Sequence, residues 1–367
     1  MKYIFLLSGD YTDLGAEEVV SLLGVKQFKL KNRLMILELN DESLLDKMSK
    51  RLALTKNIYR FLFECKLDDL IKSMGEFGWN SVYKENFCVR KFDIDWNSRN
   101  GIIKKSANNK SNAKSDNSKF SEKNLAGLIW RNLKNPKVSL KNPKTEINMF
   151  FLEGRVYCGL LVKKIIYDFN LRKAHKRPFP HPSSLHPKVA RALVNLSEIK
   201  ENQSMLDPFC GTGGLLIEAG LMNIKSIGYD ISRIISDGCK KNLEYFQIKN
   251  FKIFNANALK ILHKFDCVVT DLPYGLNSNV IVENKKSDGK SRRLNLKIQK
   301  KNFYGDLEKF YLSFLKNLRK IMTGKAVIIF PSYVDYKKLL KDSNFKMEKE
   351  FSIYVHRSLT RKIVKIR

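Results

Sequence analysis

The segment T-D-L-P-Y-G, residues 270–275, places an acid, a proline, an aromatic ring and a glycine at the end of a predicted strand. It directly follows the apolar run 267–269, which is typical of a buried strand. An ordinary turn uses the same residue types. However, the carboxylate of Asp271 and the carbonyl of Leu272 are two adjacent hydrogen-bond acceptors, and such a pair suits chemistry on an amino group.

The reaction that fits these residues is methyl transfer to an exocyclic amino group of a base. The lone pair of that amine is delocalised into the ring, and two acceptors that hold its N–H groups turn the lone pair toward the methyl group. Asp271 also relieves the positive charge that grows on the nitrogen. Pro273 restricts Leu272 and so fixes its carbonyl, and Tyr274 offers a face on which a flipped or single-stranded base stacks.

A second segment, M-L-D-P-F-C-G-T-G-G at residues 205–214, reads as a strand followed by a glycine turn and a helix. Glycines let the backbone pass close to a ligand, and a helix begins with unpaired N–H groups. The spacing of the glycines is not that of a dinucleotide-binding loop, which disfavours a nicotinamide oxidoreductase. Asp207 would repel a pyrophosphate, but it suits a positively charged group such as the ammonium of S-adenosylmethionine.

Polar residues also follow the next two predicted strands. Asp230 follows strand 226–229 and can accept hydrogen bonds from both hydroxyls of a ribose. Alternatively it caps the next helix, a role that Ser232 can fill instead. Asn257 follows strand 251–254 and suits an adenine amino group, although an ordinary turn residue is the simpler interpretation.

The elements that position these residues alternate between strands and helices from residue 181 onward. This alternation predicts an α/β fold with a parallel sheet covered by helices on both faces. Ligands of such sheets bind beyond the carboxyl ends of the strands, where both segments fall. The expected strands are 204–209, 226–229, 251–254, 265–270 and 326–330, and the expected helices are 215–222, 232–246 and 307–322.

The chain before this region has mixed α+β character. Residues 1–60 predict a small α+β unit, residues 61–163 continue in the same style, and the basic, proline-containing stretch 164–180 predicts a linker. Two further polar, basic stretches, 97–119 and 281–301, predict surface loops. Each of these loops either contacts RNA or is a solvated insertion.

The composition favours a polyanionic partner. The 367 residues include 68 Lys and Arg against 37 Asp and Glu, a net charge of +31. Such a chain is drawn to nucleic acid first and to an acidic membrane surface second, unless the excess is only a lysine-rich bias. The six cysteines contain no C-x-x-C pair, so we expect no zinc site and a reducing, cytoplasmic location. The sequence has no apolar run of 18 residues, so we expect no membrane span.

Taken together, loop 207–214 and tetrad 271–274 resemble the class I, Rossmann-type amino methyltransferases. More closely, the chain resembles the archaeal tRNA guanine-N2 methyltransferases that act on guanosine 10. The segment R-P-F-P-H-P-S-S-L-H-P, residues 177–187, is similar to the start of that family's catalytic domain. The ending Y-V-H-R-S-L-T-R, residues 354–361, is similar to its C-terminal strand pair. R-L-A-L-T, residues 51–55, is similar to the region that leads into its THUMP domain.

The resemblance implies four parts and a set of site residues. The parts are a ferredoxin-like unit at 1–60, a THUMP RNA-binding domain at 61–163, a linker at 164–180, and a Rossmann-like methyltransferase domain at 181–367 with a mostly parallel seven-stranded sheet. The cofactor would be S-adenosylmethionine and the partner tRNA, and we expect a monomer without metal. The implied catalytic residues are Asp271, Leu272, Pro273 and Tyr274. The implied cofactor-binding residues are Asp207, Phe209, Gly211, Thr212, Gly213, Asp230, Asn257 and Ala258.

Two positions depart from the family's pattern. Leu272 stands where a proline is common, but its backbone carbonyl is retained, so we expect little loss. Asn257 stands where the superfamily commonly has an acid, which leaves its role less certain. The leading hypothesis is methylation of the N2 amino group of a tRNA guanosine, guanosine 10 first, to N2-methyl- and N2,N2-dimethylguanosine. The alternatives are another tRNA guanosine, another base amino group in RNA or DNA, and an RNA-binding module without catalysis.

Overall fold

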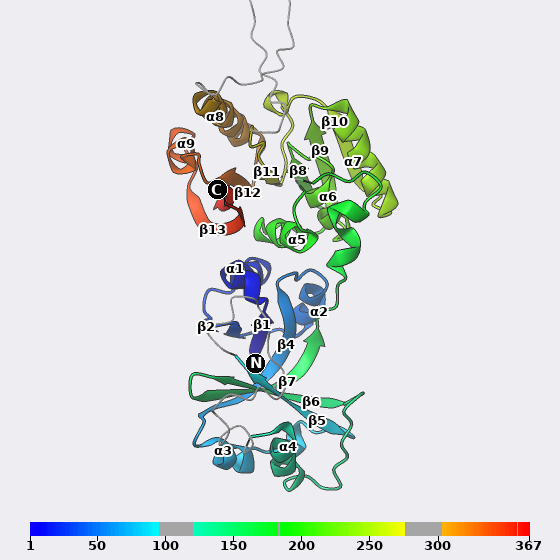
Figure 1. Cartoon of the computed structure of the whole chain (residues 1–367), viewed down its shortest axis with the longest axis vertical. Coiled ribbons are helices and arrows are strands. Elements are labelled where there is room, and N and C mark those ends of the chain that lie inside the picture. The colour runs from blue at the N-terminus through cyan, green and yellow to red at the C-terminus, as the bar shows by residue number, and fades with distance from the viewer. Residues whose placement is uncertain (95–119, 183, 276–302, 358) are drawn as a thin grey trace, which may run out of the picture. The chain divides into compact units, whose positions relative to one another are not determined.

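The computed structural model contains two compact units, Met1–Tyr167 and Asp168–Arg367. Over the described residues, each unit is built on a seven-stranded sheet (Figure 1). The predicted basic loops 97–119 and 281–301 lie outside the described residues. The structure describes residues 1–94, 120–182, 184–275, 303–357 and 359–367.

The sheet of the first unit has the strand order β2-β3-β1-β4-β7-β6-β5. Neighbouring strands are antiparallel except β5 and β6, which are parallel. Because β4 crosses residue 60, one sheet connects the predicted parts 1–60 and 61–163, and the division between them stays a prediction. The strands are β1 (Lys2–Leu7), β2 (Lys29–Lys31), β3 (Leu34–Glu38), β4 (Thr55–Lys66), β5 (Phe87–Asp93), β6 (Thr145–Leu152) and β7 (Arg155–Lys164).

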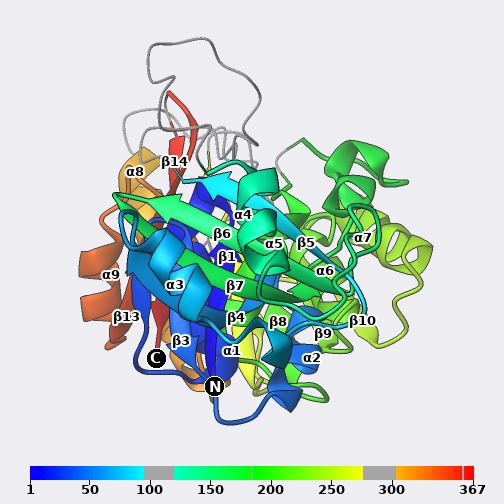
Figure 2. The ribbon, with the colours of Figure 1, turned by 90° about the horizontal axis from the view of Figure 1, so that it is seen from below.

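Two pairs of helices cover the sheet of the first unit. The helices α1 (Thr12–Leu23) and α2 (Ser43–Ser49) bury apolar side chains against β1, β3 and β4. The helices α3 (Leu70–Glu76) and α4 (Glu122–Trp130) pack against β5, β6 and β7, and Figure 2 shows them side by side. Removing this apolar surface from water stabilises both halves of the sheet.

The sheet of the second unit has the strand order β10-β9-β8-β11-β12-β14-β13. The first five strands run parallel, and β14 is antiparallel to both β12 and β13. This arrangement confirms the predicted α/β fold with a mostly parallel sheet. The strands are β8 (Ser204–Asp207), β9 (Lys225–Asp230), β10 (Phe251–Asn255), β11 (Cys267–Asp271), β12 (Ala326–Pro331), β13 (Met347–His356) and β14 (Leu359–Ile366).

Helices lie on both sides of this sheet, with α6 and α7 on one side and α8 and α9 on the other (Figure 1). The main core of the unit joins apolar residues of α8 and α9 to those of β8, β9, β11, β12 and β14. The helices are α5 (Pro187–Leu196), α6 (Gly214–Gly220), α7 (Arg233–Tyr245), α8 (Phe303–Ile321) and α9 (Tyr336–Asp342). The 3₁₀ turns within the described residues are η1 (Gly9–Tyr11), η2 (Trp79–Ser81), η3 (Phe169–Arg172), η4 (Ala174–Lys176) and η5 (Ala258–Lys260).

A buried ion cluster attaches residues 168–180 to the second unit. Glu218 of α6, 1% exposed, accepts hydrogen bonds from Arg172 Nε at 2.7 Å and from Arg191 Nε at 2.8 Å. A buried carboxylate needs such partners because its desolvation is costly. The C-terminal part of the stretch that the sequence predicts as a linker is therefore packed against α5 and α6.

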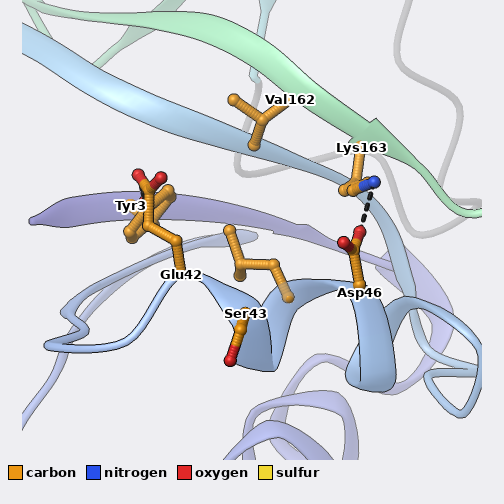
Figure 3. Close-up of a pocket in the computed structure, with 7 residues that line it drawn as sticks. Tyr3, Glu42, Ser43, Asp46, Val162 and Lys163 are labelled. Atoms are coloured by element: carbon orange, nitrogen blue, oxygen red, sulfur yellow. Dashed lines mark hydrogen bonds and ion pairs between the residues drawn. The ribbon is translucent and has the colours of Figure 1, made fainter.

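A hollow of about 300 Å³ opens in the first unit (Figure 3). The polar groups beside it are paired with one another, since the Tyr3 hydroxyl donates to Glu42 and Lys163 forms an ion pair with Asp46. All the predicted site residues lie in the second unit, so this hollow is not part of the candidate site. Its lining residues are Tyr3, Glu42, Ser43, Leu45, Asp46, Val162 and Lys163.

Candidate functional site

Three acids meet at the carboxyl edge of the parallel strands in the second unit. Asp207 ends β8, Asp230 ends β9 and Asp271 ends β11. These strands are neighbours in the order β9-β8-β11, and all run in the same direction. Ligands bind at the carboxyl edge of such a sheet. The sheet brings the three acids together there, although Asp207 and Asp271 are 64 residues apart in the sequence.

The glycine loop between β8 and α6 is shaped by its backbone. Gly211 and Gly213 have φ angles of +51° and +85°, in the left-handed region that favours glycine. A Cβ at Gly213 would lie 2.8 Å from the Cys239 sulfur, so the loop packs closely on α7 there. A Cβ at Gly211 would meet nothing within 4 Å. The loop is therefore packed against α7 at Gly213, whereas the space beside Gly211 is open.

Asp207 is a fixed acceptor beneath this loop. It is 2% exposed, and its Oδ1 accepts hydrogen bonds from the Thr270 hydroxyl at 2.8 Å and from the Phe209 N–H at 3.2 Å. Burial raises the pKa of Asp207 to about 7, and the charges of Asp271 and Asp230 act in the same direction. A cation bound beside Asp207 would reverse this effect, so the three acids favour a positively charged ligand.

Asp230 ties the glycine loop to the start of α7. Its Oδ2 accepts a hydrogen bond from the Gly211 N–H at 3.2 Å, and its Oδ1 accepts one from the Ser232 N–H at 2.9 Å. Burial raises the pKa of Asp230, and these two N–H groups oppose the rise. The N-cap of α7 is Ser232, whose side chain accepts from the Ile235 N–H. Ser232, and not Asp230, is therefore the N-cap of α7. The side chain of Asp230 lies at the carboxyl edge of the sheet, where it can contact a ligand.

The remaining predicted cofactor residues lie around the same loop or after β10. Phe209 packs edge-on against Phe314 of α8, with ring centroids 5.0 Å apart. The Thr212 hydroxyl lies 3.1 Å from that of Ser184. Asn257 caps η5, where its Oδ1 accepts from the Leu259 N–H at 2.9 Å, and Ala258 is buried. This capping role accounts for an asparagine at position 257 even when no ligand is bound, so the contact of Asn257 with adenine stays a prediction.

Asp271 is bound on both carboxylate oxygens by side chains. The Tyr274 hydroxyl donates to Oδ1, and Arg361 Nη2 lies 3.4 Å from Oδ2. Arg361 Nε also donates to the Tyr274 hydroxyl at 2.8 Å, which closes a three-residue network. Burial raises the pKa of Asp271 to about 6, while Arg361 and Tyr274 oppose the rise. The network therefore holds a carboxylate that is ionised at neutral pH and still basic.

Two tyrosines fix the backbone that follows Asp271. The Tyr311 hydroxyl of α8 donates to the Pro273 carbonyl at 2.8 Å, and the Tyr333 hydroxyl donates to the Tyr274 carbonyl at 2.7 Å. Leu272 is 2% exposed and belongs to the apolar core, and its N–H donates to the Ile329 carbonyl at 3.3 Å. A proline has no N–H to make that bond, so leucine serves the core in a way that the family's commoner residue cannot.

Sequence reasoning missed five residues that shape this edge, among them Tyr333, which follows the predicted strand 326–330. Thr270 lies in segment 270–275 and Arg361 in segment 354–361, but the spacing of residues did not indicate which side chain either one contacts. Tyr311 lies in a predicted helix. Asn242 of α7 is fully buried and bonds the carbonyls of Thr212 and Phe179. A polar residue on the apolar face of a predicted helix was the one available signal for Asn242.

Two further observations concern ions and membranes. Across the part of the chain that the structure describes, no group of three or more His, Cys, Asp or Glu side chains is arranged to hold a metal ion. Every helix within the described ranges is too short or too polar to span a membrane.

Comparison with known proteins identifies relatives of the whole chain. A family model described as an RMKL-like methyltransferase domain matches residues 174–286. The tRNA (guanine(10)-N2)-dimethyltransferase of Methanothermobacter thermautotrophicus is 31% identical over 321 residues, which cover 86% of this chain and 83% of that protein. The enzyme of the same name from Methanocaldococcus jannaschii is 27% identical and covers 98% of this chain and 97% of its own length.

A solved structure supports the fold. The crystal structure of TrmN from Thermus thermophilus superposes with a TM-score of 0.51 at 14% identity, and the match covers 100% of this chain and 99% of that one. At this identity the similarity concerns the fold, which agrees with the α/β architecture of the second unit.

Proposed function

The chain belongs to the tRNA (guanine(10)-N2)-dimethyltransferase family, and on that premise we propose that it methylates the N2 amino group of a guanosine in tRNA with S-adenosylmethionine. The proposed target is guanosine 10, and the products are N2-methyl- and N2,N2-dimethylguanosine. One observation carries the proposal: the basic carboxylate of Asp271 lies at the same sheet edge as the buried acid Asp207 and the loop-binding acid Asp230.

The residues at this edge fit the cofactor. An acid whose pKa is raised by burial and further by two neighbouring acids suits the ammonium group of the methionine part, and the open position at Gly211 leaves room beside the loop. Asp207 would hold the ammonium, Asp230 the ribose hydroxyls, and Asn257 the adenine amino group. When bound, S-adenosylmethionine supplies an electrophilic methyl carbon on its sulfonium.

Asp271 and the Leu272 carbonyl would hold the two N–H groups of the target amine, so that its lone pair points out of the base plane. As N2 gains a methyl group it loses one proton, and the Asp271 carboxylate is the base that receives it. A pKa of about 6 suits this role, because the group is ionised at neutral pH yet remains a competent acceptor. The ring of Tyr274 would stack on the base once its hydroxyl leaves Asp271.

Mass spectrometry of nucleosides tests the proposed activity. A tRNA transcript incubated with the protein and S-adenosylmethionine should yield N2-methylguanosine, followed by N2,N2-dimethylguanosine, at one position. Methylated adenosine or cytidine would assign the site to another amino group. A protein that binds both the cofactor and tRNA but forms no methylated nucleoside would instead be a binding module.

We also propose that residues 61–163 form a THUMP-type RNA-binding domain and that the first unit docks tRNA. An exposed stretch of this unit, residues 130–144, supports the proposal because it combines positive charge with an exposed aromatic ring, Trp130, which is 46% exposed. Such surfaces attract the phosphate backbone and stack on bases. The exposed basic residues of the stretch are Arg131, Lys134, Lys137, Lys141 and Lys144.

Charge reversal tests this docking surface. Replacing Arg131, Lys134 and Lys137 with Glu should weaken tRNA binding by about 10-fold or more and reduce its salt dependence, because fewer counterions are released. The same reversal at three exposed lysines of the other end of the unit, Lys26, Lys29 and Lys31, is the matched control. If both variants lose tRNA affinity equally, tRNA binding depends on the net charge of the protein and not on this stretch.

We further propose that the enzyme acts in the cytoplasm as a monomer. The six cysteines are all free and buried, which supports a reducing compartment. Light scattering of the purified protein, alone and with tRNA, measures the oligomeric state.

A further inference from the structure

Arg361 connects the end of the chain to the proposed acceptor site. It lies 87 residues beyond Tyr274 in sequence, yet its guanidinium contacts both Tyr274 and Asp271. Its side chain is 13% exposed, and that of Asp271 is 20% exposed. Both groups are therefore largely shielded from solvent and still accessible to a bound base.

The strand that carries Arg361 is held firmly in place. Arg361 is paired with Pro331 of β12 on one side and with Ile353 of β13 on the other. The neighbouring Thr360 exchanges hydrogen bonds with Ser332, at 2.9 Å and 3.3 Å. A residue on a central strand is positioned more precisely than one on a loop, so the guanidinium is well placed for recognition.

The contact between Arg361 and Asp271 is loose enough to admit a ligand. The Nη2–Oδ2 distance of 3.4 Å exceeds the roughly 2.7–2.9 Å of a charge-assisted hydrogen bond. Asp271 Oδ2 can therefore accept a further donor, and the guanidinium can exchange one of its present contacts for a hydrogen bond to the same ligand. At Oδ1, an incoming amino group takes the position of the Tyr274 hydroxyl.

The order of these groups matches one base. The Watson–Crick edge of guanine presents, in sequence, the N2 amino donor, the N1–H donor and the O6 acceptor. The protein presents Asp271 Oδ1, Asp271 Oδ2 and Arg361, which are an acceptor, an acceptor and a donor. In adenine and cytosine the ring nitrogen next to the amino group carries a lone pair, and that lone pair would face the carboxylate.

We propose that Arg361 is a specificity-determining residue that selects guanine by donating a hydrogen bond to O6 of the target base, while Asp271 accepts from N1–H and N2–H. This inference rests on the proposed function. It requires the base to leave its pair, as enzymes that act on base edges do. Tyr274 exchanges its hydroxyl contact with Asp271 for a stacking contact with the same base.

Base analogues in tRNA test the assignment. Ligated tRNA would carry guanosine, 6-thioguanosine or 2-aminopurine at the position that mass spectrometry identifies. 6-Thioguanosine keeps N1–H and the amino group but replaces O6 with sulfur, a weak acceptor. The wild type should prefer guanosine over 6-thioguanosine by about tenfold or more in kcat/KM, because a charged donor loses its partner. 2-Aminopurine, which lacks both N1–H and O6, should react more slowly still.

Substitution of Arg361 should remove this preference. R361M should methylate guanosine about tenfold or more slowly, and its preference over 6-thioguanosine should fall below about twofold. The control K362M removes a positive charge from the same strand at a residue that contacts Ser352 and Glu350, and it should keep the wild-type preference. Cofactor affinity within about twofold of the wild type reports that each variant is folded.

The outcomes separate this inference from the proposed function. If R361M loses rate but keeps the wild-type preference, Arg361 only supports Asp271 and the inference is wrong. Should R361M fail to fold, R361A also removes every N–H donor of this side chain, and an unchanged preference in R361A overturns the assignment equally. If the wild type methylates no tRNA guanosine, the proposed function itself fails.

Discussion

Asp207 and Asp271 end neighbouring strands of one sheet, but the protein holds them by different means. Asp207 accepts from a backbone N–H and from the hydroxyl of Thr270, both on the same sheet edge. Asp271 is held by the side chains of Tyr274 and Arg361, and Arg361 comes from another strand pair. The first acid is fixed by short, local donors, and the second by long side chains that can move.

This difference suits the two kinds of ligand that we propose for these acids. A cofactor that is bound in the same way at every turnover suits a rigid acceptor, and Asp207 is 2% exposed and held at Oδ1 by two donors. A base that must enter and leave suits an acceptor whose partners can be exchanged. Burial raises the pKa of both acids, since both lie at the same sheet edge, whereas their different partners suit the separate roles that we propose.

The largest expected effect is at Asp271. D271A should lower kcat by about 10³-fold, because the amine loses both an orienting acceptor and its base. The affinities for S-adenosylmethionine and tRNA should change by less than about threefold, as measured by calorimetry and filter binding. Substantial turnover in D271A would remove the assigned role. A large loss of cofactor affinity would show that the two acids do not act separately.

The complementary change at Asp207 should act on the cofactor. D207N should weaken S-adenosylmethionine binding by about 10-fold or more, because the ammonium loses a buried counter-charge. The matched control is D266N. Asp266 precedes β11 and accepts from Ser204 at the opposite edge of the sheet. If D266N weakens cofactor binding as much as D207N, the effect is one of stability and not of charge at the ligand.

The same contrast explains which parts were predictable. The proposed cofactor site lies within one strand–helix–strand unit, so the spacing of Asp207, the glycines and Asp230 predicted it from the local sequence. The structure confirmed the parallel strands and the order of their helices. The partner Arg361 of Asp271 depends instead on β14 being inserted antiparallel between β12 and β13, and no local pattern specifies that strand order.

Sequence reasoning also missed helices and strands that are short or whose pattern is interrupted. The helices α3 and α9 have seven residues each, too few to show a helical period, and neither follows a glycine turn like the one that indicated the equally short α6. The strand β4 is twelve residues long, but its burial does not alternate regularly, and register shifts interrupt its pairing with β7. Tertiary pairing therefore decides its conformation, and the local sequence does not.

Leu272 allows the backbone of the tetrad to be tested without changing its polar side chains. L272P should destabilise the protein by about 2–4 kcal/mol, because it removes the N–H bond to Ile329 and leaves space in the core. Thermal unfolding measures this loss. The carbonyl of residue 272 is retained, so kcat below the unfolding temperature should stay within about tenfold. A collapse of kcat in folded L272P would mean that the side chain, and not the carbonyl, supports the reaction.

The smallest expected effect is at the Tyr274 hydroxyl and concerns pH. Its hydrogen bond lowers the pKa of Asp271, which burial raises to about 6. Y274F keeps the ring but removes this donor, so the pKa of Asp271 should rise further. Since the reaction requires the ionised carboxylate, the acid limb of kcat/KM should move to higher pH, while the rate at pH 8 falls by less than about tenfold. The control Y333F removes a hydroxyl that donates to the Tyr274 carbonyl and not to the carboxylate of Asp271, and it should leave the limb unchanged. An acid limb that stays in place in Y274F would show that the phenol does not tune Asp271, and the movable partner of that carboxylate would then be Arg361 alone.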